Sequence, residues 1–319
     1  QASILVGNYL QKGDMVIFES TVCPGVTEYE CLPLSEEHSQ LSVITECGLG
    51  YIAKRITPSD KDINFTNITK VTSGAKRIDA IYSYVITVGT HLALTTKVAE
   101  TAKVIENTQR NLNIVLVNQL AQLFAILEID AKLVLDAAKT KVSCLPFQSG
   151  LVGSHDLGVD PYYLYQKSET VGYIPDIILA GRRLNDGMGV YVAQQIIKAM
   201  SKRKITLHTA KVLVLGVTFK ENCPDIRNSK VIDMVKELEN YACSVSIYDP
   251  LADKEDVQSK FNLSVLERTE GAKFDVLVLA VPHEELIRNI DEYVNTLKSN
   301  CLIYDLKGVL PQKYTAMRL

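Results

Sequence analysis

The chain has 319 residues, with 34 Lys and Arg against 37 Asp and Glu, and 47% of its residues are hydrophobic. A net charge of −3 argues against non-specific nucleic-acid binding, which requires a basic surface to neutralise phosphates. At roughly 150 residues per domain the length predicts about two domains with a sizeable core, and no apolar run approaches the roughly 18 residues of a membrane helix.

The seven cysteines are scattered along the chain and form no Cys-x-x-Cys pair. An odd, unpatterned set predicts reduced thiols in a cytoplasmic protein, with neither a disulfide framework nor a metal site. The first residue is Gln1, and residues 2–11 already have a helical pattern. We therefore expect the sequence to begin partway into a domain.

The first part of the sequence alternates between strand and helix patterns. The apolar run 15–22 predicts a strand that ends at the turn Cys23-Pro24-Gly25. Two further strands are predicted at 67–73 and 84–90, with a helix at 75–85. This alternation is typical of a parallel α/β layer.

A long helix is predicted from about residue 95 to 127, where neither Gly nor Pro interrupts the sequence. Its apolar residues recur at steps of three, four or seven, which places them on one helix face. At about 1.5 Å per residue the helix would extend on the order of 50 Å, so we expect it to join two domains or to form a subunit contact. Burial within one domain is the alternative. The residues of this face are Val98, Ile105, Leu112, Leu116, Leu120, Leu123 and Leu127.

After a region that resembles a loop at 144–164 and a helix at 175–200, the pattern becomes a repeated β–α–β series. That series predicts a doubly wound domain. Its strands are predicted at 211–216, 244–248, 275–281 and 301–305, with an amphipathic helix at 229–240. The predicted domains are an α/β domain at 1–92, a helical region at 93–203 and a Rossmann-like domain at 204–319.

The glycine fingerprint of a dinucleotide site, Gly-x-Gly-x-x-Gly after a strand, is absent. Gly216 ends a predicted strand, but the bulky residues 217–220 follow it and would keep the backbone from a pyrophosphate. A lysine near the carboxyl end of a strand can still hold phosphate, which makes Lys220 a candidate. A solvated surface lysine is the alternative.

The long helix carries Lys103 and Asn107 four residues apart, so their side chains meet on one face. Beside a cleft, such a pair could stabilise a developing alkoxide or orient a water molecule. The alternative is a solvated stripe with the ion pairs Glu100–Lys103 and Glu106–Arg110.

The densest polar cluster lies at 153–164. Ser154, His155 and Asp156 are consecutive, so they cannot all converge as a nucleophile triad. His155 alone is more often a structural residue than a catalytic one.

Taken together, segments in the same order and spacing over almost the whole chain resemble the UDP-glucose/GDP-mannose (nucleotide-sugar) dehydrogenase family. The resemblance is greatest to the branch that oxidises UDP-N-acetylhexosamines to uronic acids. The matching segments are 19–25, 97–110, 153–164, 180–186, 217–222 and 225–229.

The resemblance implies Rossmann-like doubly wound α/β domains joined by a long central helix, with an incomplete N-terminal NAD-binding domain and a C-terminal domain for a UDP-sugar. It implies a homodimer formed through that helix, and an NAD-dependent oxidation of a sugar C6 alcohol to a carboxylate for surface polysaccharide synthesis. In the family, a cysteine traps the aldehyde as a thiohemiacetal, a second hydride leaves, and water cleaves the thioester.

The resemblance also assigns catalytic and cofactor roles. Lys103 and Asn107 would act at the C6 oxygen, and Asp160 would assist proton transfer. Thr21 and Arg227 would contact NAD.

On the substrate side, the resemblance implies that Phe219 and Lys220 hold the uridine diphosphate. Leu145 and Phe147 would line the sugar site.

Several positions depart from the family pattern. Asp156 stands where the family has its nucleophilic cysteine, and a carboxylate is a poor aldehyde trap. The family's Ser-Pro-Glu-Arg-Ile corresponds to 52–56, where Lys54 replaces the glutamate, and 58–60 has Ser59 in place of a glycine. We therefore expect a dehydrogenase of impaired turnover that completes at best the first oxidation. The alternative is a non-catalytic, UDP-sugar-binding relative.

Overall fold

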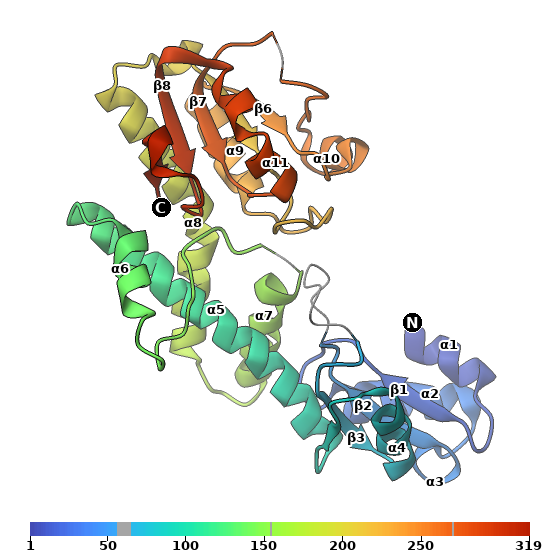
Figure 1. Cartoon of the computed structure of the whole chain (residues 1–319). Helices are drawn as coiled ribbons and strands as arrows, with labels where there is room; N and C mark the ends of the chain where they lie inside the picture. Colours follow the sequence, from blue (N-terminus) through green and yellow to red (C-terminus); the bar gives the residue numbers. More distant parts are fainter. Residues whose placement is uncertain (56–64, 154, 270) are drawn as a thin grey trace. The chain divides into compact units, whose positions relative to one another are not determined.

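The computed structural model describes residues 1–55, 65–153, 155–269 and 271–319, and of residues 155–159 it describes the backbone alone (Figure 1). The chain forms two compact units. The first unit contains residues 1–109 and 159–175, and the second contains 110–158 and 176–319. Among the described residues, no helix combines the length and apolarity needed to cross a bilayer.

The first unit is built on a four-stranded sheet. Its strands, in sheet order, are β1 (Met15–Phe18), β2 (Gly48–Ile52), β3 (Lys70–Gly74) and β4 (Thr90–Leu92). β1 and β2 are parallel, as are β3 and β4, but β2 and β3 are antiparallel. The sheet is therefore mixed, and the expectation of an all-parallel layer in this region is wrong.

The antiparallel pair brings two backbones unusually close at Gly74. This residue has φ +90°, and a Cβ atom there would lie 2.0 Å from the backbone oxygen of Leu49. Only glycine can adopt this backbone conformation and also leave room for the Leu49 oxygen, because it has no Cβ atom. The β2–β3 pairing therefore depends on it.

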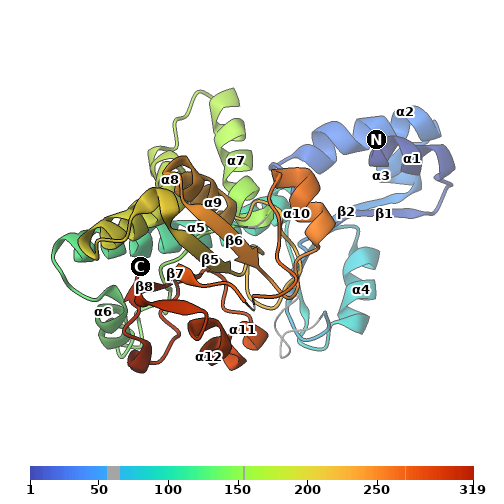
Figure 2. The ribbon, with the colours of Figure 1, turned by 90° about the horizontal axis from the view of Figure 1, so that it is seen from above.

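Helices border this sheet. Figure 2 shows α1 (Ala2–Tyr9) and α2 (Leu32–Ser39) on one side of β1 and β2, with α4 (Lys76–Val85) on the other. A π-helix, Thr27–Cys31, and the short α3, Val43–Glu46, complete this part of the unit. The strand predicted at 84–90 is wrong, because α4 extends to Val85 and a turn separates it from β4.

Four helices, α5 to α8, occupy the described part of the sequence between residues 96 and 202. α5 (Thr96–Ile126) confirms the predicted long helix and is followed by α6 (Ala131–Ala138) and α8 (Asp176–Lys202). α7 (His155–Thr170) includes residues 155–164 of the region predicted as a loop, whereas residues 144–153 form neither helix nor strand. The loop prediction is therefore confirmed for 144–153 and wrong for 155–164, because Gly158 and Pro161 lie inside a helix.

The second unit contains a five-stranded parallel sheet in the order β6–β5–β7–β8–β9. All four strands predicted here are confirmed. The strands are β5 (Lys211–Leu215), β6 (Ser244–Tyr248), β7 (Phe274–Leu279), β8 (Leu297–Asp305) and the short β9 (Met317–Arg318).

The sheet of the second unit is buried on both faces, as its continuous apolar runs predict. Val212 and Val214 pack with α8 and α9 (Val231–Asn240), whereas Leu213 and Leu215 pack on the opposite face. That face is covered by the short helices α11 (Glu284–Arg288) and α12 (Ile290–Val294), and α10 (Lys254–Phe261) follows β6. Two short 3-10 helices, Leu207–Thr209 and Gln312–Tyr314, complete the unit.

The strand order places a topological switch point beside β5. The chain passes from β5 to β6 on one side and later returns to β7 on the other side of β5. Ligands of doubly wound sheets bind at the carboxyl ends of the strands at such a point. The loops after β5 and β7 are therefore where a ligand of the second unit is expected.

Candidate active site

In the first unit, α5 anchors the turn that follows β1. The buried carboxylate of Glu100 accepts hydrogen bonds from the backbone N–H groups of Gly25 (2.5 Å) and Thr27 (2.9 Å). Gly25 has φ +93°. Thr21 lies between β1 and this turn, at the edge where parallel β1 and β2 both end. α5 thereby holds the Thr21 segment at the ligand-binding edge of the sheet.

The structure brings two of the predicted catalytic residues into direct contact. The side-chain amide of Asn107 on α5 donates a hydrogen bond to the carboxylate of Asp160 on α7, and both residues are buried. Lys103 lies one helical turn before Asn107 and is also buried. Among the described residues no hydrogen-bond acceptor pairs with its ammonium group. A buried cation at this position is suited to an anionic or polarised oxygen of a ligand.

The alternative of a solvated polar stripe on α5 is wrong. Glu100 is 0% exposed, Lys103 8% and Asn107 9%. Glu100 bonds to backbone amides, and Glu106 pairs with Arg55 rather than with Arg110.

Arg55 and Lys70 belong to the same region and were missed from the sequence. Arg55 contacts Glu106 through two nitrogens, with Nε 3.2 Å from Oε2, and its Nη1 donates to the backbone oxygen of Thr69 at 2.8 Å. The buried Nζ of Lys70 donates to the backbone oxygen of Arg55 at 3.0 Å. Burial lowers the pKa of Lys70. Arg55 and Glu106 both lie in or beside motif segments, but spacing alone cannot pair residues that are 51 positions apart.

Tyr51 at the end of β2 is also a buried polar residue that the sequence did not single out. It is 0% exposed, and its hydroxyl has no hydrogen-bond partner among the described residues. Burial raises its pKa, and the charges of Glu100, Asp160 and Glu106 raise it further. Tyr51 is therefore a neutral phenol that retains its proton beside a carboxylate-rich region.

The position of the family nucleophile falls at the start of α7. Asp156 is the second residue of that helix, and its side chain lies outside the described residues, as do residues 58–60. Lys54 is exposed. Cys23 is half-buried: burial raises the pKa of its thiol, and its Sγ donates to the backbone oxygen of Tyr163 at 3.4 Å.

In the second unit, Phe219 and Lys220 follow β5 and line a common pocket at the switch point. Lys230 and Lys307 also line it. The Nζ of Lys220 lies 5.9 Å from the centre of the Phe219 ring. Lys230 pairs with Asp186 and Asp233, and Lys307 with Glu221. Lys220 has no ion-pair partner among the described residues, and an aromatic ring beside such a lysine suits a ligand that combines a base with phosphate groups.

The other predicted residues of the second unit lie apart from this pocket lining. Leu145 is exposed and Phe147 is half-buried, and neither lines the pocket. The residue of this segment that does line it is Leu151. Arg227 is exposed and bonds to Asp225, with Nη2 2.6 Å from Oδ2.

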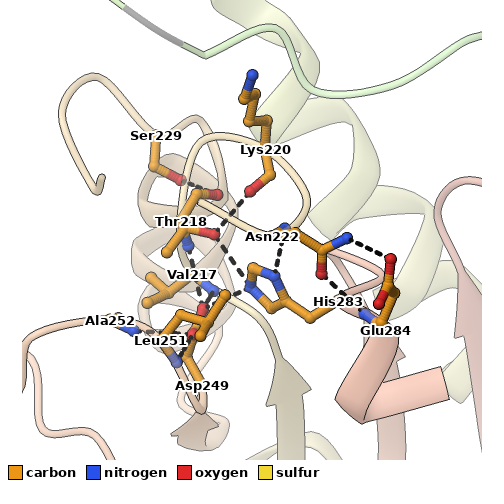
Figure 3. A network of polar contacts seen from close by, with 10 residues as sticks. All are labelled: Val217, Thr218, Lys220, Asn222, Ser229, Asp249, Leu251, Ala252, His283 and Glu284. Carbon is orange, nitrogen blue, oxygen red and sulfur yellow. Dashed lines mark hydrogen bonds and ion pairs between the residues drawn. The ribbon is translucent and has the colours of Figure 1, made fainter. Parts of the chain in front are cut away.

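A network of buried polar residues lies beneath the loop that carries Phe219 and Lys220 (Figure 3). Asp249, directly after β6, accepts five N–H groups. Its Oδ1 accepts from Leu251 (2.8 Å) and Ala252 (3.0 Å), and its Oδ2 accepts from Val217 (2.6 Å), Thr218 (3.2 Å) and the ring of His283 (3.2 Å). Burial alone would raise its pKa, but these donors hold the pKa below its ordinary value.

Comparison with known proteins gives matches over the whole chain. Residues 97–187 match the central domain of the UDP-glucose/GDP-mannose dehydrogenase family, and residues 213–312 match its UDP binding domain. The chain is 49% identical to a UDP-N-acetyl-D-glucosamine 6-dehydrogenase of Salmonella typhi, over 100% of this chain and 76% of that protein. It is 48% identical to a UDP-N-acetyl-D-glucosamine 6-dehydrogenase of Pseudomonas aeruginosa, over 100% of this chain and 77% of that protein.

Solved structures agree in fold. A UDP-D-ManNAc dehydrogenase of Pyrococcus horikoshii superposes with a TM-score of 0.86 at 25% identity, covering 98% of this chain and 73% of that one. The doubly wound architecture and the long helix are therefore shared with dehydrogenases of nucleotide sugars. With nearly half of its residues identical to curated relatives over its full length, the chain belongs to the UDP-glucose/GDP-mannose dehydrogenase family.

Proposed function

We propose that the protein acts on a UDP-N-acetylhexosamine, oxidising the sugar C6 alcohol towards the uronic acid with NAD as oxidant, for use in surface polysaccharide synthesis. The observation that carries this proposal is the buried group formed by Lys103, Asn107 and Asp160. The names of its relatives in Salmonella typhi and Pseudomonas aeruginosa support the choice of sugar. The test is to supply the purified protein with UDP-N-acetylglucosamine and NAD and to measure NADH and the sugar product.

The residues on α5 and α7 would divide the chemistry of the first oxidation. The ammonium group of Lys103 would stabilise negative charge on the C6 oxygen as its proton leaves. Asn107, held by Asp160, would orient that oxygen. Asp160 would take up the proton.

Part of a binding site for NAD is present in these residues. Thr21 lies at the carboxyl edge of β1 and β2 in a segment that Glu100 fixes, whereas the 319 residues contain no glycine-rich phosphate loop. When bound, NAD would accept the hydride from C6. We assign Thr21 and Arg227 to its contacts.

The pocket after β5 would hold the uridine diphosphate. Phe219 would contact the base and Lys220 the phosphates, whereas Lys230 and Lys307 in the same lining already pair with carboxylates. Leu145 and Phe147 remain our candidates for the sugar.

Lys220→Ala is expected to weaken UDP binding about tenfold to a hundredfold, because a hydrogen bond to a charged group contributes about 1.5–3 kcal/mol. Isothermal titration calorimetry with UDP measures the loss. Lys236→Ala, which removes an exposed lysine of α9 outside the pocket lining, is the matched control and should leave the affinity unchanged. Equal affinities for both variants would contradict the assignment of the pocket.

Two positions favour a second candidate function. Asp156 and Lys54 replace the nucleophile and a carboxylate that the family chemistry uses, so the chain would complete at best the first oxidation. A non-catalytic protein that binds a UDP-sugar through the second unit is therefore the alternative. Binding of UDP-sugar without saturable binding of NAD would favour it.

We propose that α5 packs against a second copy of the chain. An apolar stripe of this helix is open to solvent, with Val98, Ile105, Leu116 and Leu123 exposed by 51%, 52%, 54% and 46%. Such a stripe is typical of a helix that packs against another subunit.

Leu116→Glu is expected to convert the dimer to a monomer, because it places a charge in the centre of the apolar stripe. Sedimentation velocity gives the mass of the particle. Lys236→Glu, at an exposed position on α9, should remain dimeric. A monomeric unmodified protein at micromolar concentration would refute the dimer.

A further inference from the structure

His283 connects the loop of the UDP pocket to the buried carboxylate beneath it. The residue follows β7 and is 1% exposed. Its Nδ1 accepts the backbone N–H of Asn222 at 2.9 Å. Its Nε2 lies 3.2 Å from Oδ2 of Asp249 and 3.1 Å from Oγ1 of Thr218.

These contacts define the proton on the ring. A backbone N–H can only donate, so Nδ1 of His283 is an acceptor and Nε2 carries the hydrogen. The Nε2–H group then points to Asp249 and Thr218, whose carboxylate and hydroxyl oxygens accept. The hydroxyl of Thr218 in turn donates to the backbone oxygen of Lys220 at 3.0 Å. The neutral ring therefore bonds through Nδ1 to the Asn222 end of the loop, and through Nε2 to Asp249 and to the Thr218 end.

The loop from Thr218 to Asn222 is fixed at both ends by this arrangement. Asn222 has φ +53°, a left-handed conformation that asparagine adopts more readily than most other residues. Its N–H bonds to His283, and its side-chain oxygen accepts the N–H of Glu284 at 3.0 Å. Lys220 lies between the two fixed residues, and its side chain points away from the network (Figure 3).

We propose that His283 is a positioning residue of the UDP pocket. It holds the Thr218–Asn222 backbone so that Phe219 and Lys220 face the ligand without having to be ordered when the ligand binds. This inference rests on the proposed function in one respect, namely that UDP occupies the pocket. Pre-ordering a loop raises affinity because the entropy of ordering it is not lost on binding.

Three variants separate the two sides of the ring. His283→Ala removes both contacts. His283→Asn places an amide oxygen where Nδ1 lies and keeps the acceptor for Asn222, whereas His283→Gln places an amide nitrogen near Nε2 and keeps the donor to Asp249. Leu302→Ala, in the core of the same unit on β8, is the control for a general loss of stability.

Each variant is measured for its UDP affinity by calorimetry, for amide hydrogen exchange of residues 218–222 by mass spectrometry, and for its unfolding temperature. We expect His283→Ala to bind UDP at least tenfold more weakly and to exchange the Asn222 amide faster. His283→Asn should restore affinity more than His283→Gln. Leu302→Ala should unfold at lower temperature but keep both affinity and loop exchange.

Three results would overturn the inference: unchanged loop exchange in folded His283→Ala, an affinity that follows the unfolding temperature across all variants including Leu302→Ala, or a better rescue by His283→Gln. Absence of UDP binding by the unmodified chain would instead refute the proposed ligand. Faster exchange in His283→Ala would then still support the positioning of the loop.

Discussion

Purified protein supplied with UDP-N-acetylglucosamine and NAD is expected to form at most one NADH per sugar, and Asp156→Cys is expected to be required for the second. In the family chemistry the second oxidation acts on a thiohemiacetal, which loses hydride to NAD and becomes a thioester that water cleaves. A carboxylate has no sulfur with which to form either species. Cys23 does not compensate, since its thiol has a raised pKa and bonds to a backbone oxygen. We expect the second step in the unmodified chain to be slower by at least about a thousandfold.

The stoichiometry is measured by NADH absorbance against sugar consumed, with uronic acid identified by mass spectrometry. Asp156→Ala is the control, because it removes the carboxylate without supplying sulfur and should resemble the unmodified chain. Combining Asp156→Cys with Lys54→Glu restores both family positions. Two NADH per sugar from the unmodified chain would disprove the role given to Asp156. No NADH from any variant that still binds UDP would support the non-catalytic alternative.

Asp249→Ala is expected to lower the free energy of unfolding of the second unit by about 3–5 kcal/mol, the largest stability effect among these variants. The substitution leaves four backbone N–H groups in the loops after β5 and β6 without their acceptor, and leaves Nε2 of His283 with Thr218 alone. Burial prevents water from replacing the carboxylate, because the side chain of Asp249 is 0% exposed. The loss is measured by urea-dependent hydrogen exchange of the amides in β5 and β6.

Asp253→Ala is the matched control for Asp249. Asp253 is the exposed N-cap of α10, where its side chain accepts the N–H of Asp256. Removing an N-cap costs about 1 kcal/mol. Equal losses for the two variants would contradict the importance of the buried network.

The pH dependence of Asp249 follows from the direction of its pKa. Because the pKa in the folded protein is below the ordinary value of 3.8, its stabilising contribution is complete above that value. The contribution disappears as the pH falls through the folded pKa. The difference in stability between the unmodified chain and Asp249→Asn should therefore be constant near neutral pH and shrink in acid.

The sequence predicted the second unit well because its strands are buried on both faces. Runs such as 211–215 and 274–279 have no polar alternation that could be mistaken for another element. The first unit was harder to predict. β2 contains two glycines and was not recognised, and the strand predicted at 84–90 overlaps the end of α4 because Val85, Ile86 and Val88 favour either structure locally.

At the site, family motifs identified Lys103, Asn107 and Asp160, and the structure places Asn107 in contact with Asp160. The pairing of Arg55 with Glu106 and the burial of Tyr51 and Lys70 were not predictable. They depend on which residues β2, β3 and α5 bring together, and no local pattern contains that information. The same holds for His283, whose hydrogen-bond partners come from two separate loops, after β5 and after β6.

The close approach at Gly74 imposes a constraint on the fold that differs from the constraints on the proposed catalytic positions. Asp156 and Lys54 depart from the family pattern at positions that we propose for the chemistry, and the chain still has both of its sheets. Gly74 has no such freedom, because a methyl group there would collide with the neighbouring strand. A lineage that abandons catalysis would therefore keep this glycine for as long as it keeps the fold.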